Sequence, residues 1–169
     1  MLYLTLKIAT TLLVAVVMAL SLAHALELPG KMRLTREQYL AVQTIYYPGF
    51  TIGGASEPLS IVLLVVLLAV SPERSIPFWL TLAALAMLIV VQIIFWTMTQ
   101  PVNRFWFEKT RGTTTADGDG AVHRLFGSVR AGTASPDWKV LRERWELSHS
   151  FRAIAALIAT VLMVVAIAI

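Results

Sequence analysis

Cysteine is absent from the 169-residue sequence, which excludes disulfides, thiolate nucleophiles and zinc or iron–sulfur sites built on cysteine. The sequence also lacks a glycine-rich phosphate loop, an internal repeat and any signature of nucleic-acid binding. Nucleic acid is therefore not expected among the partners of this chain.

Charge is scarce as well. Charged residues make up 14% of the sequence, against 57% hydrophobic residues, and the apolar residues come in long blocks. The mean hydropathy of +0.74 lies well above that of an ordinary soluble domain. The formal net charge of +4 comes mostly from residues beside the apolar blocks, where it reflects membrane topology. We predict a multi-pass integral protein of the cell membrane, with the lipid bilayer as its first partner.

The C-terminal end has the plainest pattern. Ser135-Pro136-Asp137 is typical of a helix start, with a hydroxyl N-cap, a proline where no N–H is needed and an early acid. From Ala153 to Ile169 every residue except Thr160 is apolar or small. We predict one continuous helix that crosses the membrane over about residues 146–169 and extends into the cytoplasm. Its polar face is expected to carry residues spaced three and four apart, namely Trp138, Arg142, Trp145, His149 and Arg152.

The N-terminal apolar block predicts a first span over about residues 2–26, with Lys7 near one end and His24 and Glu27 on one face at the other. We expect Pro29-Gly30 to end this helix. Ala23-His24-Ala25 also fits a signal-peptide cleavage site. We interpret the segment as a retained span.

A short amphipathic helix is expected next, with Thr35 as N-cap and Gln38 at the capping-box position. The second span can begin in two places. A start at Pro58 leaves it too short to cross, whereas a span over about residues 45–71 crosses comfortably and carries Glu57 within the membrane. We favour the longer span.

The third span is expected over about residues 76–99, ended by Pro101-Val102-Asn103. Residues 110–134 are rich in Gly, Thr and Ala and predict a mobile surface loop, in which His123 is an ordinary solvated histidine. The expected fold is thus a single all-α membrane domain over residues 1–169, a four-helix bundle with up-down topology.

This topology gathers the polar span ends on one membrane face. The expected members are His24, Glu27, Gln43, Glu57, Asn103, Trp145, His149 and Arg152. The distribution of basic residues supports the same topology, because only Lys7 and Arg74 are expected on the other face. The polar face also receives Lys31, Arg33, Arg36, Arg104, Lys109, Arg111, Arg124, Arg130, Lys139, Arg142 and Arg144. The positive-inside rule then places the first and third loops in the cytoplasm and both termini outside.

Each of these polar residues also has a structural interpretation. Arg152 can snorkel toward lipid phosphates, His24 and His149 can be interfacial histidines, Glu27 can pair with Lys31, and Trp145 can belong to an aromatic belt. Glu57 is a functional candidate by default, because a carboxylate in lipid must be protonated or paired.

Several short motifs together resemble the anthrone-oxygenase-type family of small four-helix membrane proteins, many of unknown function. They are Trp145-x3-His149-x2-Arg152 leading into the last span, Pro101-x-Asn103, His24 with Glu27-x-Pro29, Tyr39 with Gln43, and Glu57-Pro58. The stretch near residues 111–134 looks like an insertion relative to that pattern.

The resemblance implies oxidation of a lipophilic anthrone to a quinone by O₂ at the cytoplasmic interface. Such a reaction needs a general base, a cation for the substrate anion and an apolar entrance. We expect His149 or His24 as base, Glu27 to orient it and Arg152 to hold the anion. Gln43, Asn103, Trp145 and Glu57 are the expected substrate-binding residues.

Two other classes remain open. In one, His24, Glu27, Glu57 and His149 bind a metal ion or heme, since imidazole and carboxylate suit iron, copper or zinc. In the other, the chain is a non-catalytic accessory or scaffold protein. Its partners are then a larger membrane complex or further copies of itself rather than a lipophilic small molecule.

Overall fold

The computed structural model describes residues 1–46, 48–111 and 137–169, with the backbone alone for residues 107–111. These residues form helices and connecting turns and include no strand, as the expected all-α class requires. The predicted loop at 110–134, including His123, lies from residue 112 onward outside the described residues.

Helix α1 (Leu2–Lys31) is longer than expected, because Pro29 and Gly30 lie inside it instead of ending it. A proline in the last turn removes only one helical hydrogen bond, the one its N–H would donate. The helix therefore continues to Lys31, whose side chain is buried. Because the helix continues, Lys31 lies on the same face as His24, seven residues before it.

Helix α2 (Arg36–Gln43) begins with the predicted capping box. The Thr35 hydroxyl accepts from the Gln38 backbone N–H, and the Gln38 side chain accepts from the Thr35 backbone N–H. The 3-10 turn η1 (Thr44–Tyr46) follows. Together these elements place Tyr39 and Tyr46 in the interior.

Helices α3 (Gly49–Gly54) and α4 (Ser56–Val70) follow each other with an interruption at Ala55. Together they form one apolar stretch of 22 residues, Gly49–Val70, which begins a few residues later than the predicted start at residue 45. Glu57 lies in the first turn of α4, and its side chain is mostly buried.

Helix α5 (Ile76–Ile94) starts at Ser75, whose hydroxyl accepts from the Phe78 backbone N–H. It passes through a π-helical turn, η2 (Phe95–Thr99), into α6 (Gln100–Arg111). The expected helix end at Pro101-Val102-Asn103 is therefore wrong. Because Pro101 stands at the start of α6, directly after the wider π turn, its missing N–H does not break the helix.

Helix α8 (Trp138–Ala168) is the predicted continuous C-terminal helix. Its N-cap is Asp137, which accepts from the Lys139 backbone N–H, rather than Ser135, which lies outside the described residues. Asp is as good an N-cap as Ser, so the helix begins two residues later than expected.

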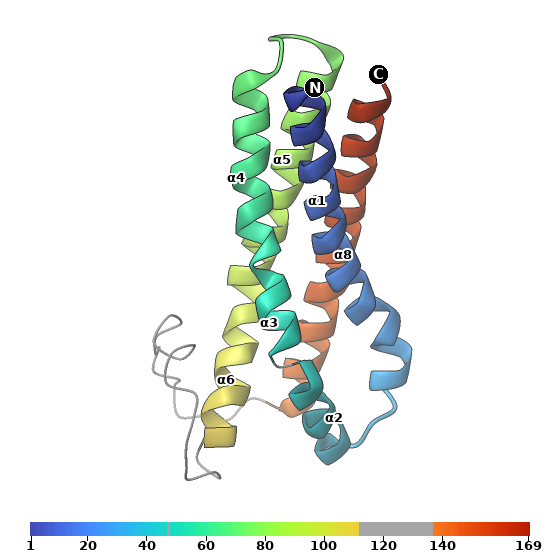
Figure 1. Ribbon diagram of the computed structural model, residues 1–169. Helices are drawn as coiled ribbons and strands as arrows, with labels where there is room; N and C mark the ends of the chain where they lie inside the picture. Colours follow the sequence, from blue (N-terminus) through green and yellow to red (C-terminus); the bar gives the residue numbers. More distant parts are fainter. Residues whose placement is uncertain (47, 112–136) are drawn as a thin grey trace.

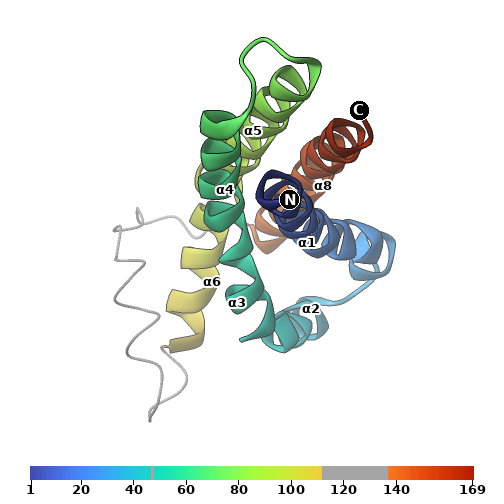
Figure 2. The same cartoon turned by 45° about the horizontal axis from the view of Figure 1, so that its top comes forward.

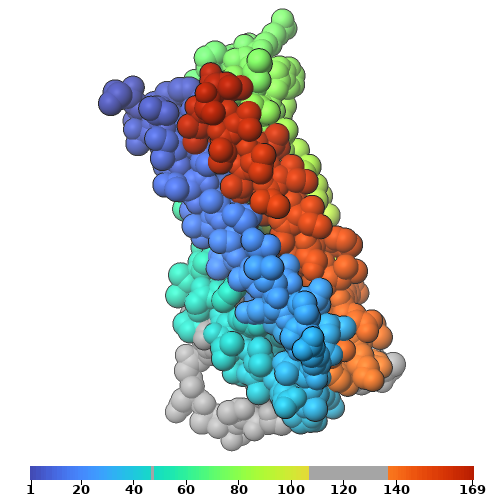
Figure 3. All heavy atoms as spheres, turned by 90° about the vertical axis from the view of Figure 1, so that its right-hand side faces the viewer, coloured from blue at the N-terminus to red at the C-terminus, as the bar shows by residue number. Residues whose placement is uncertain are grey.

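Helix α8 packs most extensively against α1 and α5, while α4 packs against α1 and α5 (Figures 1 and 2). Alanines of α8 line the shared core and allow close approach of the backbones. The core residues are Val14, Val17, Leu64, Leu67, Ala84, Leu88, Val91, Ala155, Ala156, Ala159 and Met163. The turn between α4 and α5 lies at the same end as both termini, and α2 lies at the opposite end (Figure 1). Helices α1 and α8 run side by side along one face (Figure 3).

Within the described residues, four helical stretches are long and apolar enough to cross a membrane: Leu2–Lys31, Gly49–Val70, Ile76–Trp106 and Trp138–Ala168. Large apolar side chains point outward from each of them, among them Leu12, Val62, Ile93 and Val161. Such a continuous apolar exterior is unusual for a soluble protein.

Candidate functional site

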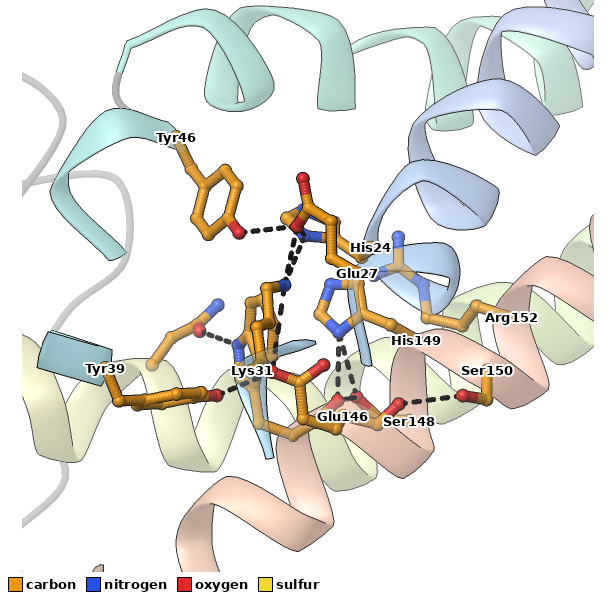
Figure 4. Close-up of polar contacts among 12 residues, drawn as sticks. His24, Glu27, Lys31, Tyr39, Tyr46, Glu146, Ser148, His149, Ser150 and Arg152 are labelled. Carbon is orange, nitrogen blue, oxygen red and sulfur yellow. Dashed lines mark hydrogen bonds and ion pairs between the residues drawn. The ribbon is translucent and has the colours of Figure 1, made fainter. Parts of the chain in front are cut away.

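Two histidines from the ends of the sequence meet in the lower half of the bundle. The ring centroids of His24, from α1, and His149, from α8, lie 4.4 Å apart at 67°. Each residue is only 5% exposed, so neither ring points outward as an interfacial histidine would. Figure 4 shows the two rings among the polar side chains of this region.

The hydrogen bonds of His149 define its tautomer. Its Nδ1 lies 2.9 Å from the backbone oxygen of Trp145, one turn earlier in α8. A carbonyl oxygen can only accept, so Nδ1 carries the ring proton and Nε2 presents a lone pair. That lone pair lies 3.4 Å from Nη1 of Arg152, which can only donate.

Arg152 is buried, and it does not snorkel toward lipid phosphates. It forms an ion pair with Glu57 of α4 and lies over the ring of Phe95. The second carboxylate oxygen of Glu57 accepts from the Gln92 side chain at 2.9 Å. The predicted residues Glu57, His149 and Arg152 are thus joined, with Gln92 as an additional partner.

His24 is surrounded by charged and aromatic groups. Its Nδ1 lies 3.4 Å from Nζ of Lys31 and 3.8 Å from the carboxylate of Glu27. The rings of Tyr46 and Phe50 lie against it, each with its centroid 4.5 Å away. The same Glu27 oxygen accepts from the Tyr46 hydroxyl at 2.6 Å. Glu27 therefore contacts His24 and not His149, which separates the two candidate bases.

Lys31 is a member of this cluster that the sequence prediction did not include. It is 4% exposed, and its Nζ lies 2.8 Å from Glu27 and 3.7 Å from Glu146 (Figure 4). The same ammonium lies over the rings of Tyr46 and Trp145, at 4.8 and 4.9 Å from their centroids. Lys31 follows Glu27 by four residues and His24 by seven, a spacing that predicts a shared helix face. Because the helix was expected to end at Pro29, Lys31 was not assigned to that face.

Glu146 is the second missed residue and is 1% exposed. Its Oε1 accepts from the hydroxyl of Tyr39 at 2.9 Å. Its Oε2 is buried and has no hydrogen-bond partner in the described part of the chain. Burial, together with the neighbouring carboxylate, raises the pKa of Tyr39, so this phenol stays protonated and donates. The spacing of three residues between Glu146 and His149 placed both near one face of α8.

Aromatic side chains enclose the polar cluster. Trp145 packs on His149 with ring centroids 4.0 Å apart, and its indole N–H donates to Oδ1 of Asn103 at 2.9 Å. Trp145 is thus buried in the site and does not belong to an outer belt. Gln43 is the last residue of α2. It is half-buried, and its Nε2 has no hydrogen-bond partner in the residues that the structure covers.

The metal or heme alternative required a set of imidazoles and carboxylates around one point. Among the described residues, no group of three His, Asp or Glu is arranged to hold a metal ion. Glu57 and Glu27 instead bind the two cations, Arg152 and Lys31. This geometry gives the metal alternative no support.

The comparisons with known proteins add no family to these observations. No protein-family model matches the chain, and neither a curated protein nor a solved structure is significantly similar to it.

Proposed function

We propose that the chain is a multi-pass membrane protein with up-down topology, in which the end that holds the imidazole cluster faces the cytoplasm. The four apolar stretches and their outward apolar side chains support insertion. The excess of basic residues at the α2 end supports the orientation, because positive loops stay on the cytoplasmic side.

We infer that this protein is an oxygenase-like enzyme that acts on a lipophilic, anthrone-like aromatic substrate with O₂. One observation carries the inference: the buried pair of His24 and His149 lies between two cations, Lys31 and Arg152. Burying ionisable groups in an apolar bundle costs free energy, so such groups are candidates for a functional site. A base beside fixed cations is what the removal of a proton from an acidic C–H requires.

The proposed reaction balances without a cofactor. The base removes one proton from the CH₂ group, and the carbanion, an aromatic phenolate-like anion, passes one electron to O₂. The resulting radical and superoxide combine to a peroxide anion. A base then removes the second C–H proton, the outer peroxide oxygen takes up the first proton as the O–O bond breaks, and a C=O bond forms. The hydroxide that leaves takes up the second proton and becomes water. One CH₂ group and one O₂ thus give one carbonyl group and one H₂O.

The geometry distinguishes the two histidines in this reaction. The lone pair of His149 faces Arg152, a guanidinium that stays protonated, whereas Nδ1 of His24 faces Lys31, an ammonium that can exchange a proton. We therefore assign the base to Nδ1 of His24, with Glu27 beside it to orient the ring. Once the substrate anion forms, Arg152 holds its oxygen, while the Nε2 lone pair of His149 positions Arg152.

The expected substrate-binding residues take different parts. Trp145, fixed by Asn103, offers an aromatic face against which a fused ring system stacks. Glu57 holds Arg152 in place. Gln43 has an unused amide donor near this end of the bundle. Because Tyr46 and Phe50 cover His24, substrate entry requires their displacement.

The test uses the full chain in lipid nanodiscs with an anthrone and O₂, followed by quinone absorbance and oxygen uptake. His24→Gln should lower kcat by about 10²- to 10⁴-fold, the usual contribution of a general base. His149→Gln should lower it less. Thr97→Ala, an exposed change, serves as the control. Turnover that persists in both histidine variants would contradict the assignment.

Absence of turnover in the unmodified protein would contradict the enzyme proposal itself. Co-purification with fixed partners, unaffected by His24→Gln, would then favour the accessory role. Metal analysis and a visible absorption spectrum of the same preparation test the metal or heme class.

A further inference from the structure

We propose that Glu146, reached through Lys31, is a proton store for the imidazole site. It takes up the proton that leaves the substrate and returns it when the O–O bond breaks. This inference rests on the proposed function. It assigns a role to Glu146, which the base and the anion-holding groups leave unused, and a second role to Lys31.

Lys31 lies between the base and the carboxylate, within ion-pair distance of Glu146, and its side chain has to move slightly closer to transfer a proton. Nδ1 of His24 lies 3.4 Å from Nζ of Lys31, which lies 3.7 Å from Oε1 of Glu146 (Figure 4). The three residues are between 1% and 5% exposed. A proton that moves along this series therefore does not pass through bulk water.

Glu146 differs from Glu27, the other carboxylate near Lys31. The Glu27 side chain is 43% exposed, and its Oε2 is bound by both Lys31 and the Tyr46 hydroxyl. In Glu146, Tyr39 and Lys31 both approach Oε1, which leaves Oε2 buried and free of partners within the described residues. When the carboxyl group turns to present Oε2 to Lys31, a proton placed there replaces no existing hydrogen bond of Oε2 and removes the cost of a buried bare acceptor.

The other charged groups around Glu146 are compatible with this role. From α1, Lys31 and Glu27 face it, and from α2 the neutral hydroxyl of Tyr39 does. From its own helix, the guanidinium of Arg142 lies against the rings of Trp138 and Tyr39. The carboxylate is thus paired by one ammonium that also contacts the base.

The transfer conserves every proton and charge. When His24 has become an imidazolium, Lys31 gives one of its protons to Glu146, and the amine takes the Nδ1 proton of His24. One N–H bond of Lys31 breaks and one forms, so the ammonium is unchanged at the end. An O–H bond has formed on Glu146, and His24 is again a neutral base.

The stoichiometry of the proposed reaction explains why a store is useful. Conversion of CH₂ and O₂ into C=O and H₂O releases no net proton, yet two C–H protons must leave before the water is complete. His24 has to be neutral again before it can remove the second one. A neighbouring group that holds the first proton in the interval allows the same imidazole to act twice.

The test compares Glu146→Gln with Glu143→Gln, an exposed change on the same helix. Both variants keep the side-chain shape and remove one carboxylate. We expect Glu146→Gln to lower kcat by about 10- to 100-fold with KM unchanged, while Glu143→Gln matches the unmodified protein. Helical circular dichroism and monodispersity in detergent verify folding.

A second readout does not depend on turnover. Infrared difference spectra recorded between alkaline and acidic pH should contain the carbonyl band of a protonated, buried carboxylic acid. Because Glu57 is a second buried carboxylate, that band should lose intensity in Glu146→Gln and keep it in Glu143→Gln. Loss of intensity with reduced kcat supports the store. Normal kcat in Glu146→Gln, or a band of unchanged intensity after this substitution, overturns it. An unmodified protein without turnover contradicts the proposed enzyme instead, while the infrared result still decides whether Glu146 takes up a proton.

Discussion

Glu57 in α4 and Arg152 in α8, which are 95 positions apart in the sequence, form a buried ion pair. Gln92 of α5 donates to the other oxygen of the same carboxylate. One carboxylate therefore connects three of the four long helices at a single depth. Since Arg152 also contacts His149, this connection fixes one side of the imidazole pair.

Removing one partner of this ion pair should strongly destabilise the bundle. Arg152→Met leaves the Glu57 carboxylate buried with a single amide donor, a change that typically costs about 3–5 kcal/mol of unfolding free energy. The double variant Glu57→Gln/Arg152→Met removes both charges and should recover more than half of that loss. Reversible unfolding in mixed micelles measures both. Additive effects of the two single substitutions would show that the pair is not coupled.

Two adjacent glycines in α3 should differ in their tolerance of alanine. A Cβ at Gly53 would lie 2.8 Å from Cδ1 of Leu20 in α1, whereas a Cβ at Gly54 meets nothing within 4 Å. Both substitutions gain helix propensity, but only Gly53→Ala forces the Leu20 side chain to move. We expect Gly54→Ala to be more stable than Gly53→Ala by about 1 kcal/mol. Equal thermal midpoints would contradict the close approach of α3 to α1.

The buried phenol of Tyr39 should make the folded protein less stable in alkaline solution. Burial raises its pKa in the folded protein above the value of about 10 that it has in the unfolded chain. Above about pH 10 the unfolded chain loses the phenol proton while the folded protein keeps it. The contribution of Tyr39 to the free energy of unfolding is therefore fully present below about pH 10 and decreases above it, by up to about 1.4 kcal/mol per pH unit. Tyr39→Phe removes this part of the slope. Thermal midpoints measured from about pH 8 to about pH 11 test it, and identical slopes would refute it.

The absence of cysteine makes the proposed topology directly testable. Single cysteines at two exposed positions, Arg33→Cys after α1 and Glu73→Cys in the turn between α4 and α5, lie at opposite ends of the bundle. A membrane-impermeant maleimide added to intact cells should label position 73. It should label position 33 only after the membrane is opened. The reverse pattern would invert the orientation, and labelling of both positions would contradict insertion.

The sequence alone predicted the helical class, the four apolar stretches and the polar face of the last helix. These features follow from block hydrophobicity and from three- and four-residue spacing, which act over a few turns. The capping box of Thr35 and Gln38 was equally local and is confirmed. The proximity of His24 and His149 was only an expectation from topology, because contact across the bundle depends on how the helices pack.

The remaining site residues were missed for a physical reason. Proline was expected to end a helix at Pro29 and Pro101, but both helices continue, one because the proline is in the last turn and the other because it follows a π turn. Because α1 was expected to end at Pro29, the seven-residue spacing that places Lys31 and His24 on one helix face was not used. Glu146 was expected at the cytoplasmic end of the last span, and its burial beside Tyr39 of α2 and Lys31 of α1 depends on contacts between distant helices that local spacing does not predict.

The π-helical turn η2 has a consequence for the direction in which side chains point. It holds one residue more than an α-helical turn, so every residue after it is rotated by about 100° relative to an uninterrupted helix. The upper part of α5 can therefore keep its apolar residues toward the exterior while Thr99 and Asn103 face α8, where they contact Ser148 and Trp145. The one extra residue in this turn thus determines which side of the helix faces α8.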